Sequence, residues 1–231
     1  MVGNGSRSMT DHTPTTRRGF LAGATAVGSA GLAGCGILGG DGDPGPIYEP
    51  DVSTETVTPD SDGLLPTPVL GDHDADVTVM VFEDYACGHC GTYVTEHFPQ
   101  LGSEYIDPGT IRYEHHDFPL PLNEESNRAP NAARAVQDTV GSAAYWEYSQ
   151  RLYRNQSDLG PDRYASLAEE VGADPDFVRN AAINKRYSET IQADKQYGES
   201  LNVDSTPTVF VNESAVAGYD FDTVSQAIDD A

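Results

Sequence analysis

The stretch that decides the fold is Phe82–Tyr93, FEDYACGHCGTY, in which two cysteines stand three positions apart directly after an apolar run. That run, Val77–Phe82 (VTVMVF), is rich in β-branched residues and predicts a strand buried on both faces. Beyond the cysteines, apolar side chains recur at helical spacing at Val94, Phe98, Leu101 and Tyr105. We therefore expect Cys87 at a strand-to-helix junction and Cys90 one turn further into the helix.

The remainder of the chain predicts an α/β order of elements. Gly109–Leu120 indicates a second strand, which Pro119 and Pro121 end. The pattern is then helical, with candidate helices at Ala132–Val140, Ala143–Tyr153, Arg163–Val171, Pro175–Ile183 and Ser188–Leu201. Strand character returns at Thr206–Asn212 and Ala215–Tyr219, and Asp220 could cap a last helix. Parallel strands with a helical crossover and an antiparallel edge hairpin would follow from this order.

The composition restricts the classes of partner. Of 231 residues, 37 are acidic and 13 are basic, and the formal net charge is −24. Binding to nucleic acid is disfavoured, because phosphate contacts need clustered Lys and Arg. An acidic tail and a disordered chain are less favoured, because the charges are scattered and 38% of the residues are hydrophobic. The pattern resembles haloarchaeal proteins, in which high salt screens the repulsion between surface charges.

The N-terminus predicts export and anchoring. In residues 1–34, paired Arg17 and Arg18 precede an apolar run too short for a membrane span, and they resemble a twin-arginine signal. The stretch LAGC, which ends at Cys35, resembles a lipoprotein processing box; this implies cleavage before Cys35 and lipid on its sulfur. A chance arginine pair, a cleavage site elsewhere and a true start at Met9 are the alternatives. Residues 35–68 are rich in Gly, Pro, Asp, Ser and Thr and predict a flexible, disordered linker.

The cysteine pair itself has three interpretations. A zinc site needs four protein ligands, or three and a water; Cys87 and Cys90 supply two, and the other candidates are His89, His97, His115 and His116. A structural disulfide would close only a tiny loop and remove little entropy from the unfolded chain. A redox centre explains more, because the start of a helix favours the Cys87 thiolate and Cys90 lies within reach to resolve a mixed disulfide. Protonated His89 would add positive charge there, and Gly88 leaves the first turn open.

From about Leu70 to the C-terminus, the chain resembles the DsbA-type thiol–disulfide oxidoreductases, which have a thioredoxin-like fold with an inserted α-helical domain. The stretches that carry the resemblance are LGDHDADVTVMVFEDYACGHC, HHDFPLP, YWEYSQRLYRNQ and VDSTPTVFVNESAVAG. The resemblance implies a domain at 69–231 with its helical insertion at about 122–200. It also implies that Cys87 attacks and Cys90 resolves, and that Thr206 and Pro207 form a cis-proline loop that receives the substrate backbone.

One departure from the wider fold concerns proton transfer. Many thioredoxin-like enzymes carry a buried carboxylate six residues before the first cysteine, where this chain has Val81. Glu83, Asp84 or water are the alternatives for proton transfer to Cys90.

These observations predict an enzyme that forms or shuffles disulfides in exported proteins. We expect no cofactor or metal beyond the Cys87–Cys90 disulfide, and a membrane or small-molecule redox partner that recharges it. The lipid on Cys35 would hold the domain at the outer face of the cell membrane. A disulfide reductase of the same fold and a non-catalytic metal-binding lipoprotein are the alternative functions.

Overall fold

The computed structural model describes residues 48–50, 52 and 57–231. The predicted export signal at 1–34, the proposed lipid site Cys35 and much of the predicted linker lie outside the described residues. Among the helices of the described part, none has both the length and the apolar character that a membrane span requires.

Five strands of the described chain form one mixed sheet in the order β1-β3-β2-β4-β5. Their bounds are β1 Val69–Gly71, β2 Val77–Glu83, β3 Ile111–Asp117, β4 Thr208–Val211 and β5 Ser214–Ala215. β2 runs parallel to β3, while β1, β4 and β5 pair antiparallel with β3, β2 and β4 respectively. This topology confirms the predicted α/β, thioredoxin-like fold class with parallel strands joined by a helical crossover and an antiparallel hairpin at one edge.

The central strand β2 is buried on both faces, as its unbroken apolar sequence predicts. Val79 and Val81 belong to the main core, which also contains Cys87 and Cys90. Met80 and Phe82 face the opposite side and pack in a second cluster with Phe118, Val203 and Phe210. Because side chains alternate along a strand, Glu83 shares the face of Val79 and Val81. The sequence therefore aims the carboxyl group of Glu83 into the core that contains the cysteines.

A continuous helical run follows the cysteines. It comprises α1 Gly88–Thr92, the π-helical segment η1 Tyr93–His97, α2 Phe98–Leu101 and the π-helical segment η2 Gly102–Ile106. The predicted apolar positions Val94, Phe98 and Leu101 are buried against the sheet. The single helix expected from the spacing is thus present, with two π-helical turns within it.

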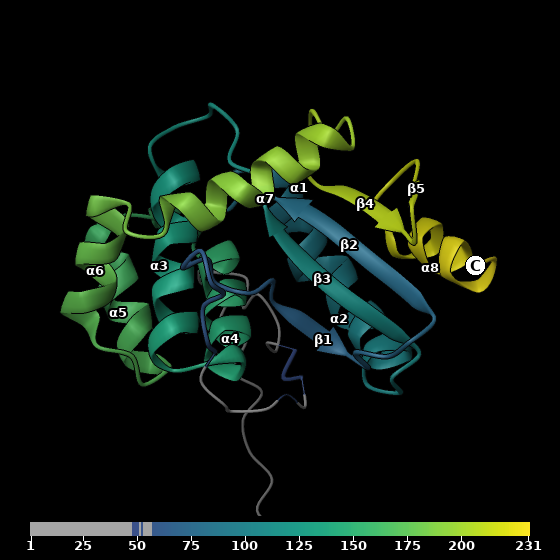
Figure 1. Cartoon of the computed structure of the whole chain (residues 1–231), viewed down its shortest axis with the longest axis horizontal. Helices are drawn as coiled ribbons and strands as arrows, with labels where there is room; N and C mark the ends of the chain where they lie inside the picture. The colour runs from purple at the N-terminus through teal and green to yellow at the C-terminus, as the bar shows by residue number, and fades with distance from the viewer. Residues whose placement is uncertain (1–47, 51, 53–56) are drawn as a thin grey trace, which may run out of the picture. The chain divides into compact units, whose positions relative to one another are not determined.

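The helical insertion lies between β3 and β4. It contains α3 Glu125–Thr139, α4 Ser142–Arg154, the 3₁₀ turn η3 Gln156–Asp158, α5 Pro161–Glu170, α6 Pro175–Asn184 and α7 Ser188–Ser200. Figure 1 shows α3–α6 gathered beside the sheet, while α7 runs from this group to the ends of β2 and β3. The last helix, α8 Phe221–Asp229, begins at Asp220, whose side chain accepts from the Thr223 backbone N–H as the predicted cap.

Three elements differ from the sequence expectation. β1 was not predicted, because three residues are too few to show a period. α3 starts at Glu125, ahead of the predicted Ala132, and continues through Pro130. Only Ser214 and Ala215 of the second hairpin strand pair with β4, because the chain turns away after two residues.

Part of the predicted linker packs on the domain. Leu65 is 6% exposed, and its backbone N–H donates to Thr190 Oγ1 at 3.1 Å. The carbonyl of Pro66 accepts from Arg134 Nη1 at 3.2 Å. The packed region therefore begins before the expected boundary at residue 69.

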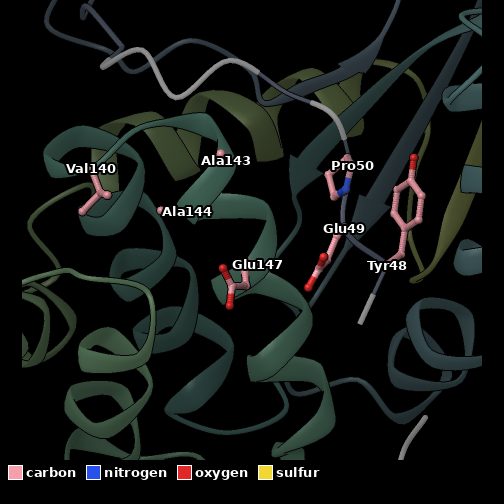
Figure 2. A pocket seen from close by; sticks show the side chains of 7 residues that line it. All are labelled: Tyr48, Glu49, Pro50, Val140, Ala143, Ala144 and Glu147. Carbon is pink, nitrogen blue, oxygen red and sulfur yellow. The ribbon is translucent and has the colours of Figure 1, made fainter. Parts of the chain in front are cut away.

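Tyr48 is seated on the domain even further toward the N-terminus. Its backbone N–H donates to Gln150 Oε1 at 2.9 Å, and Gln150 Nε2 donates back to the Tyr48 carbonyl at 2.7 Å. The Tyr48 hydroxyl donates to Asp107 Oδ1. A Cβ at Gly102 would lie 2.5 Å from the Tyr48 ring, so the ring occupies the space that a side chain would fill. Figure 2 shows Tyr48 and the next two residues beside α4.

Candidate active site

Cys87 stands at the junction predicted for it, between β2 and α1. The chain leaves β2 through a turn in which Asp84 Oδ1 accepts from the Ala86 N–H at 2.8 Å and the Asp84 carbonyl accepts from the Cys87 N–H at 3.0 Å. Cys87 is the N-cap of α1, with φ −83° and ψ 120°, so its side chain projects at the helix start. Its own carbonyl accepts from the Gly91 N–H at 3.1 Å, which begins the helical hydrogen-bond series.

The Cys87 thiol is strongly acidic. A hydrogen bond from Cys90 is the largest cause and lowers the pKa of Cys87 to about 5 against the opposing effect of burial. The nearby Thr206 side chain and the backbone N–H groups of Cys90 and His89 lower this pKa further. From the position of Cys87 at a helix start, the sequence predicts that its pKa is lowered. In the structure, the hydrogen bond from Cys90 lowers this pKa more than the backbone N–H groups at the helix start do.

Cys90 has the opposite character. It is fully buried, and its Sγ accepts from the Asp84 N–H at 3.5 Å. Burial raises the pKa of Cys90 well above its usual range, and the hydrogen bond that it donates to Cys87 and the nearby Glu83 carboxyl raise it further. Both cysteines are free thiols here. One sulfur is therefore ionised at neutral pH while its neighbour keeps its proton.

The predicted substrate loop lies beside the cysteine pair. The Thr206–Pro207 peptide bond is cis, and Cys87 Sγ lies 3.3 Å from the carbonyl oxygen of Thr206. Both features agree with the placement expected from the sequence, although 119 positions separate Cys87 from Thr206.

The two residues between the cysteines are exposed. A Cβ added at Gly88 would meet no atom within 4 Å, so the first turn of α1 is open to an approaching partner. His89 Nδ1 shares a hydrogen bond of 2.9 Å with the Tyr219 hydroxyl, which comes from the segment before α8. Sequence reasoning missed Tyr219, because nothing local links it to a histidine 130 positions away.

The structure separates the two carboxylates that were candidates for proton transfer. Asp84 is committed to the fold, since Oδ1 accepts from the Ala86 N–H and Oδ2 accepts from the Leu120 N–H at 2.7 Å. Glu83 is 3% exposed, and its Oε1 has no hydrogen-bond partner among the described residues. Burial raises the pKa of Glu83, and the hydrogen bond to His115 only partly offsets this.

A buried chain of charges extends behind Glu83. His115 Nδ1 lies 3.0 Å from Glu83 Oε2, and His115 Nε2 lies 3.4 Å from Asp117 Oδ1. Burial acts to lower the pKa of His115, but hydrogen bonds to Asp117 and Glu83 raise it to about 9. Arg134 Nε donates to Asp117 Oδ2 at 2.7 Å, and Arg134 Nη2 donates to Asp194 Oδ2 at 2.5 Å. From the sequence, His115 was predicted only as a possible metal ligand.

The histidines do not converge on the cysteines as a zinc site would require. His115 and His116 point to opposite faces of β3, as their alternation predicts: His116 stacks on Phe82, while His115 contacts Tyr85. His97 packs near Tyr219. Across the described part of the chain, no group of three or more His, Cys, Asp or Glu side chains could hold a metal ion.

A separate surface pocket lies where Tyr48 packs on the domain. Its lining comes from the N-terminal segment and from the region of α3 and α4, and Figure 2 labels these residues: Tyr48, Glu49, Pro50, Val140, Ala143, Ala144 and Glu147. None of them contributes to the surroundings of Cys87 described above. The thiol chemistry is therefore located at the start of α1 and not in this pocket.

Comparisons with known proteins agree with this geometry. The chain is similar to disulfide bond formation protein D of Bacillus subtilis, at 23% identity over 169 residues, which cover 70% of this chain and 75% of that protein. It is similar to a probable disulfide bond formation protein D of Bacillus cereus at 29% identity, covering 69% and 76% of the two chains.

Solved structures show the same fold. The oxidised BdbD of Bacillus subtilis superposes with a TM-score of 0.66 at 22% identity, over 78% of this chain and 98% of that one. DsbA of Chlamydia trachomatis superposes with a TM-score of 0.60 at 22% identity, over 71% and 90%. The sequence profile of the thioredoxin family matches residues 64–230. With this match and the thiol pair at the start of α1, the chain belongs to the thioredoxin family.

Proposed function

We propose that this protein is a thiol–disulfide oxidoreductase that forms or shuffles disulfides in exported proteins, with Cys87 as the attacking and Cys90 as the resolving cysteine. The observation that carries the proposal is the opposed protonation of two neighbouring thiols, one with its pKa lowered to about 5 and one with its pKa raised by burial. The relatives named for disulfide bond formation support it.

Transfer of a disulfide to a client proceeds in two exchanges. A client thiolate attacks Cys87 Sγ of the oxidised pair, which forms a mixed disulfide and releases Cys90 as a thiolate that takes up a proton. A second client thiolate then attacks the client sulfur of the mixed disulfide, so that the client is oxidised and Cys87 leaves as a thiolate. A low leaving-group pKa speeds this step and stabilises the reduced enzyme, which favours a disulfide donor over a reductase.

Glu83 is the group that we assign to proton exchange with Cys90. It points into the same core as Cys90, it has a free carboxyl oxygen, and its raised pKa suits a group that must accept and return a proton. Asp84 cannot take this role without giving up its hydrogen bonds to Ala86 and Leu120.

Client binding is assigned to the loop at Thr206 and Pro207. The carbonyl oxygen of Thr206 lies 3.3 Å from Cys87 Sγ, so a client segment laid along this loop would bring its own sulfur to Cys87. Backbone pairing of this kind reads few side chains and suits many unfolded clients. Gly88 keeps the approach open, and His89 borders it.

Trapping experiments test the assignment of roles. Cys90→Ser removes the resolving thiol, so mixed disulfides with client proteins should accumulate through Cys87 and be visible on non-reducing gels. The matched variant Cys87→Ser should trap none. Equal trapping by the two variants would contradict an ordered attack and resolution. A reduction potential near −120 mV would indicate a donor, and one near −270 mV a reductase.

The cellular setting belongs to the same proposal. The arginine pair, the LAGC box and the acidic composition support a haloarchaeal lipoprotein exported by the twin-arginine route and held outside the membrane by lipid on Cys35. Residues 35–68 would tether the domain, and a membrane or small-molecule oxidant would restore the disulfide. Cys35→Ser should release the protein from membranes or leave it unprocessed; unchanged cleavage and membrane association would contradict the lipid anchor.

A further inference from the structure

Gln156 of the helical insertion reaches into the cysteine turn. It begins η3, one residue after Asn155, which caps the end of α4, and it is half-buried. Its Nε2 donates to the carbonyl of Tyr85 at 2.8 Å and to the carbonyl of Cys87 at 2.8 Å. Both hydrogens of the amide are therefore used on backbone oxygens that flank Ala86, about 70 positions away in sequence.

The seat of this amide depends on Gly91. A Cβ at Gly91 would lie 2.3 Å from Gln156 Oε1 and 2.9 Å from its Cδ, and such distances are not tolerated between real atoms. The amide thus lies against the bare backbone of α1, one turn beyond Cys87. Gly91 is buried, and its N–H also donates to the Cys87 carbonyl at 3.1 Å. Two donors consequently hold the Cys87 carbonyl, one from α1 and one from the helical insertion.

These contacts surround the backbone from which the Cys87 side chain projects. An N-cap residue keeps an extended backbone while its carbonyl starts the helix, and Cys87 has no side-chain capping bond of its own. Asp84 fixes the turn from the strand side by accepting from Ala86 and Cys87. Gln156 fixes it from the opposite side by holding the carbonyls of Tyr85 and Cys87. With the peptide frame held on both sides, the sulfur faces Thr206 and Cys90.

We propose that Gln156 is a positioning residue for the redox pair: through its amide, the helical insertion fixes the backbone frame of Cys87 and thereby stabilises the thiolate. The inference rests on the proposed function, since it concerns the same pair of thiols. It adds a role for the helical insertion in the chemistry, which would otherwise only flank the sheet.

The test compares Gln156→Met with a matched control. Methionine has a similar length but cannot donate, and Gln192→Met makes the same change at an exposed position of α7. The pKa of Cys87 is followed by thiolate ultraviolet absorbance against pH, and global stability by chemical denaturation. Gln156→Met should raise the pKa of Cys87 by about one unit, which is about a tenfold loss of thiolate below the pKa, because a net hydrogen bond is of this order. Gln192→Met should leave the titration unchanged.

Gly91→Ala gives an independent route to the same state. Alanine favours a helix interior over glycine, so on local grounds it should strengthen α1 and leave the thiol unaffected. If the new Cβ displaces the Gln156 amide, however, the thiol should be affected. The pKa of Cys87 should then rise as it does in Gln156→Met. The two changes together should shift it hardly further than either alone, because they remove the same contact.

The outcomes separate the inference from the proposed function. A loss of stability in Gln156→Met without a change in the titration would make Gln156 merely structural and overturn the inference. So would additive shifts in the double variant. If Gln156→Met fails to fold, Gln156→Asn, which withdraws the amide by one carbon, provides the same comparison. Absence of an acidic thiol in the unaltered protein, or failure of Cys90→Ser to trap clients, would instead overturn the proposed function.

Discussion

At the scale of single residues, the site is defined by the difference between two sulfurs. Cys87 faces donors, namely the Cys90 thiol and the backbone N–H groups of His89 and Cys90, whereas Cys90 lies in a core that penalises its charge. Each sulfur helps to set the state of the other, because the proton that Cys90 retains is the proton that it donates to the Cys87 thiolate. The pair therefore acts as one unit with a single proton between two sulfurs.

The reduction potential should record this proton count. Above the Cys87 pKa of about 5 the reduced pair carries one proton, and below it two. Because the reduced state binds protons, the potential should fall with rising pH, by about 59 mV per unit below pH 5 and about 30 mV per unit above it. Equilibration with a glutathione buffer across this range measures the slope. A single steep slope through neutral pH would mean that Cys87 stays protonated.

Stability should follow the same group with a definite sign. The folded pKa of Cys87 lies below that of a free thiol, about 8.5. The thiolate therefore stabilises the reduced protein fully above about pH 8.5, and this contribution disappears as the pH falls toward 5.

Replacement of Glu83 tests proton exchange with Cys90. Glu83→Gln keeps the shape of the side chain and an oxygen for His115 but cannot take a proton. Escape of a mixed disulfide through attack by Cys90 should slow by about tenfold or more, and the decay of a peptide mixed disulfide followed over pH measures it. A decay rate and pH profile equal to those of the unaltered protein would exclude Glu83 from this step.

The residues of the motif could be predicted from sequence, whereas the residues that support it could not. Cys87, Cys90 and Pro207 stand in recognisable local patterns. Tyr219 and Gln156 belong to segments whose own sequences indicate only the end of a strand and the end of a helix, and they reach the site through tertiary contacts. Glu83 was one of three options, because the choice depends on which carboxyl oxygen remains unpartnered in the fold.

At the scale of elements, apolar patterns gave β2 and most helices, and packing decided the remainder. β1 is recognisable only through its pairing with β3. The face of β2 that carries Phe82 is covered by α7, which approaches closely at Gly198. A Cβ there would lie 2.8 Å from Phe118 and 2.9 Å from Phe82. The helical sequence pattern alone does not reveal that a glycine within the helix packs closely against the side chains of a neighbouring sheet.

Gly198→Ala should therefore destabilise the protein, although alanine is the better helix former. Overpacking typically lowers the free energy of unfolding by about 1–3 kcal/mol, while the higher helix propensity of alanine raises it by about 1 kcal/mol. The net loss of stability should therefore be small but measurable by chemical denaturation. Glu199→Ala, at an exposed position of the same helix, is the control and should have little effect. A net gain in stability for Gly198→Ala would show that α7 can move away from the sheet at no cost.

At the scale of the whole described domain, Arg134 connects parts that the sequence predicts separately. It lies on α3, is fully buried, and holds Asp117 of β3, Asp194 of α7 and the carbonyl of Pro66 in the N-terminal segment. The helical insertion, the sheet and the end of the predicted linker are thus joined through one guanidinium. Arginine suits this position, because its planar group donates in several directions at once.

Arg134→Met should cost about 3–5 kcal/mol, because it leaves buried carboxylates without a partner. Arg163→Met, which removes an exposed ion pair with Asp158, should cost at most about 1 kcal/mol. Denaturant midpoints at constant m-value provide the comparison. Without the Arg134 guanidinium, the buried Asp117 carboxylate has lost the positive charge that stabilises its ionised form. Protonation of Asp117 at lower pH would remove this buried charge, so the Arg134→Met variant should recover part of its stability as the pH is lowered. Equal losses for the two arginines would contradict a connecting role for Arg134.

The seat of Tyr48 determines how far the domain could travel from an anchor. Tyr48 lies thirteen positions after Cys35, whereas Leu65, the first buried residue of the described segment before the sheet, lies thirty positions after it. At full extension these spans reach roughly 45 Å and roughly 105 Å. With lipid on Cys35, a seated Tyr48 would confine the cysteine pair to a thin layer above the bilayer, where the local concentration of membrane-bound partners is high. Release of Tyr48 together with Val52 and Val57, which also pack against the core, would more than double that reach, so the balance between meeting a membrane oxidant and meeting clients would depend on a segment far from the sulfurs.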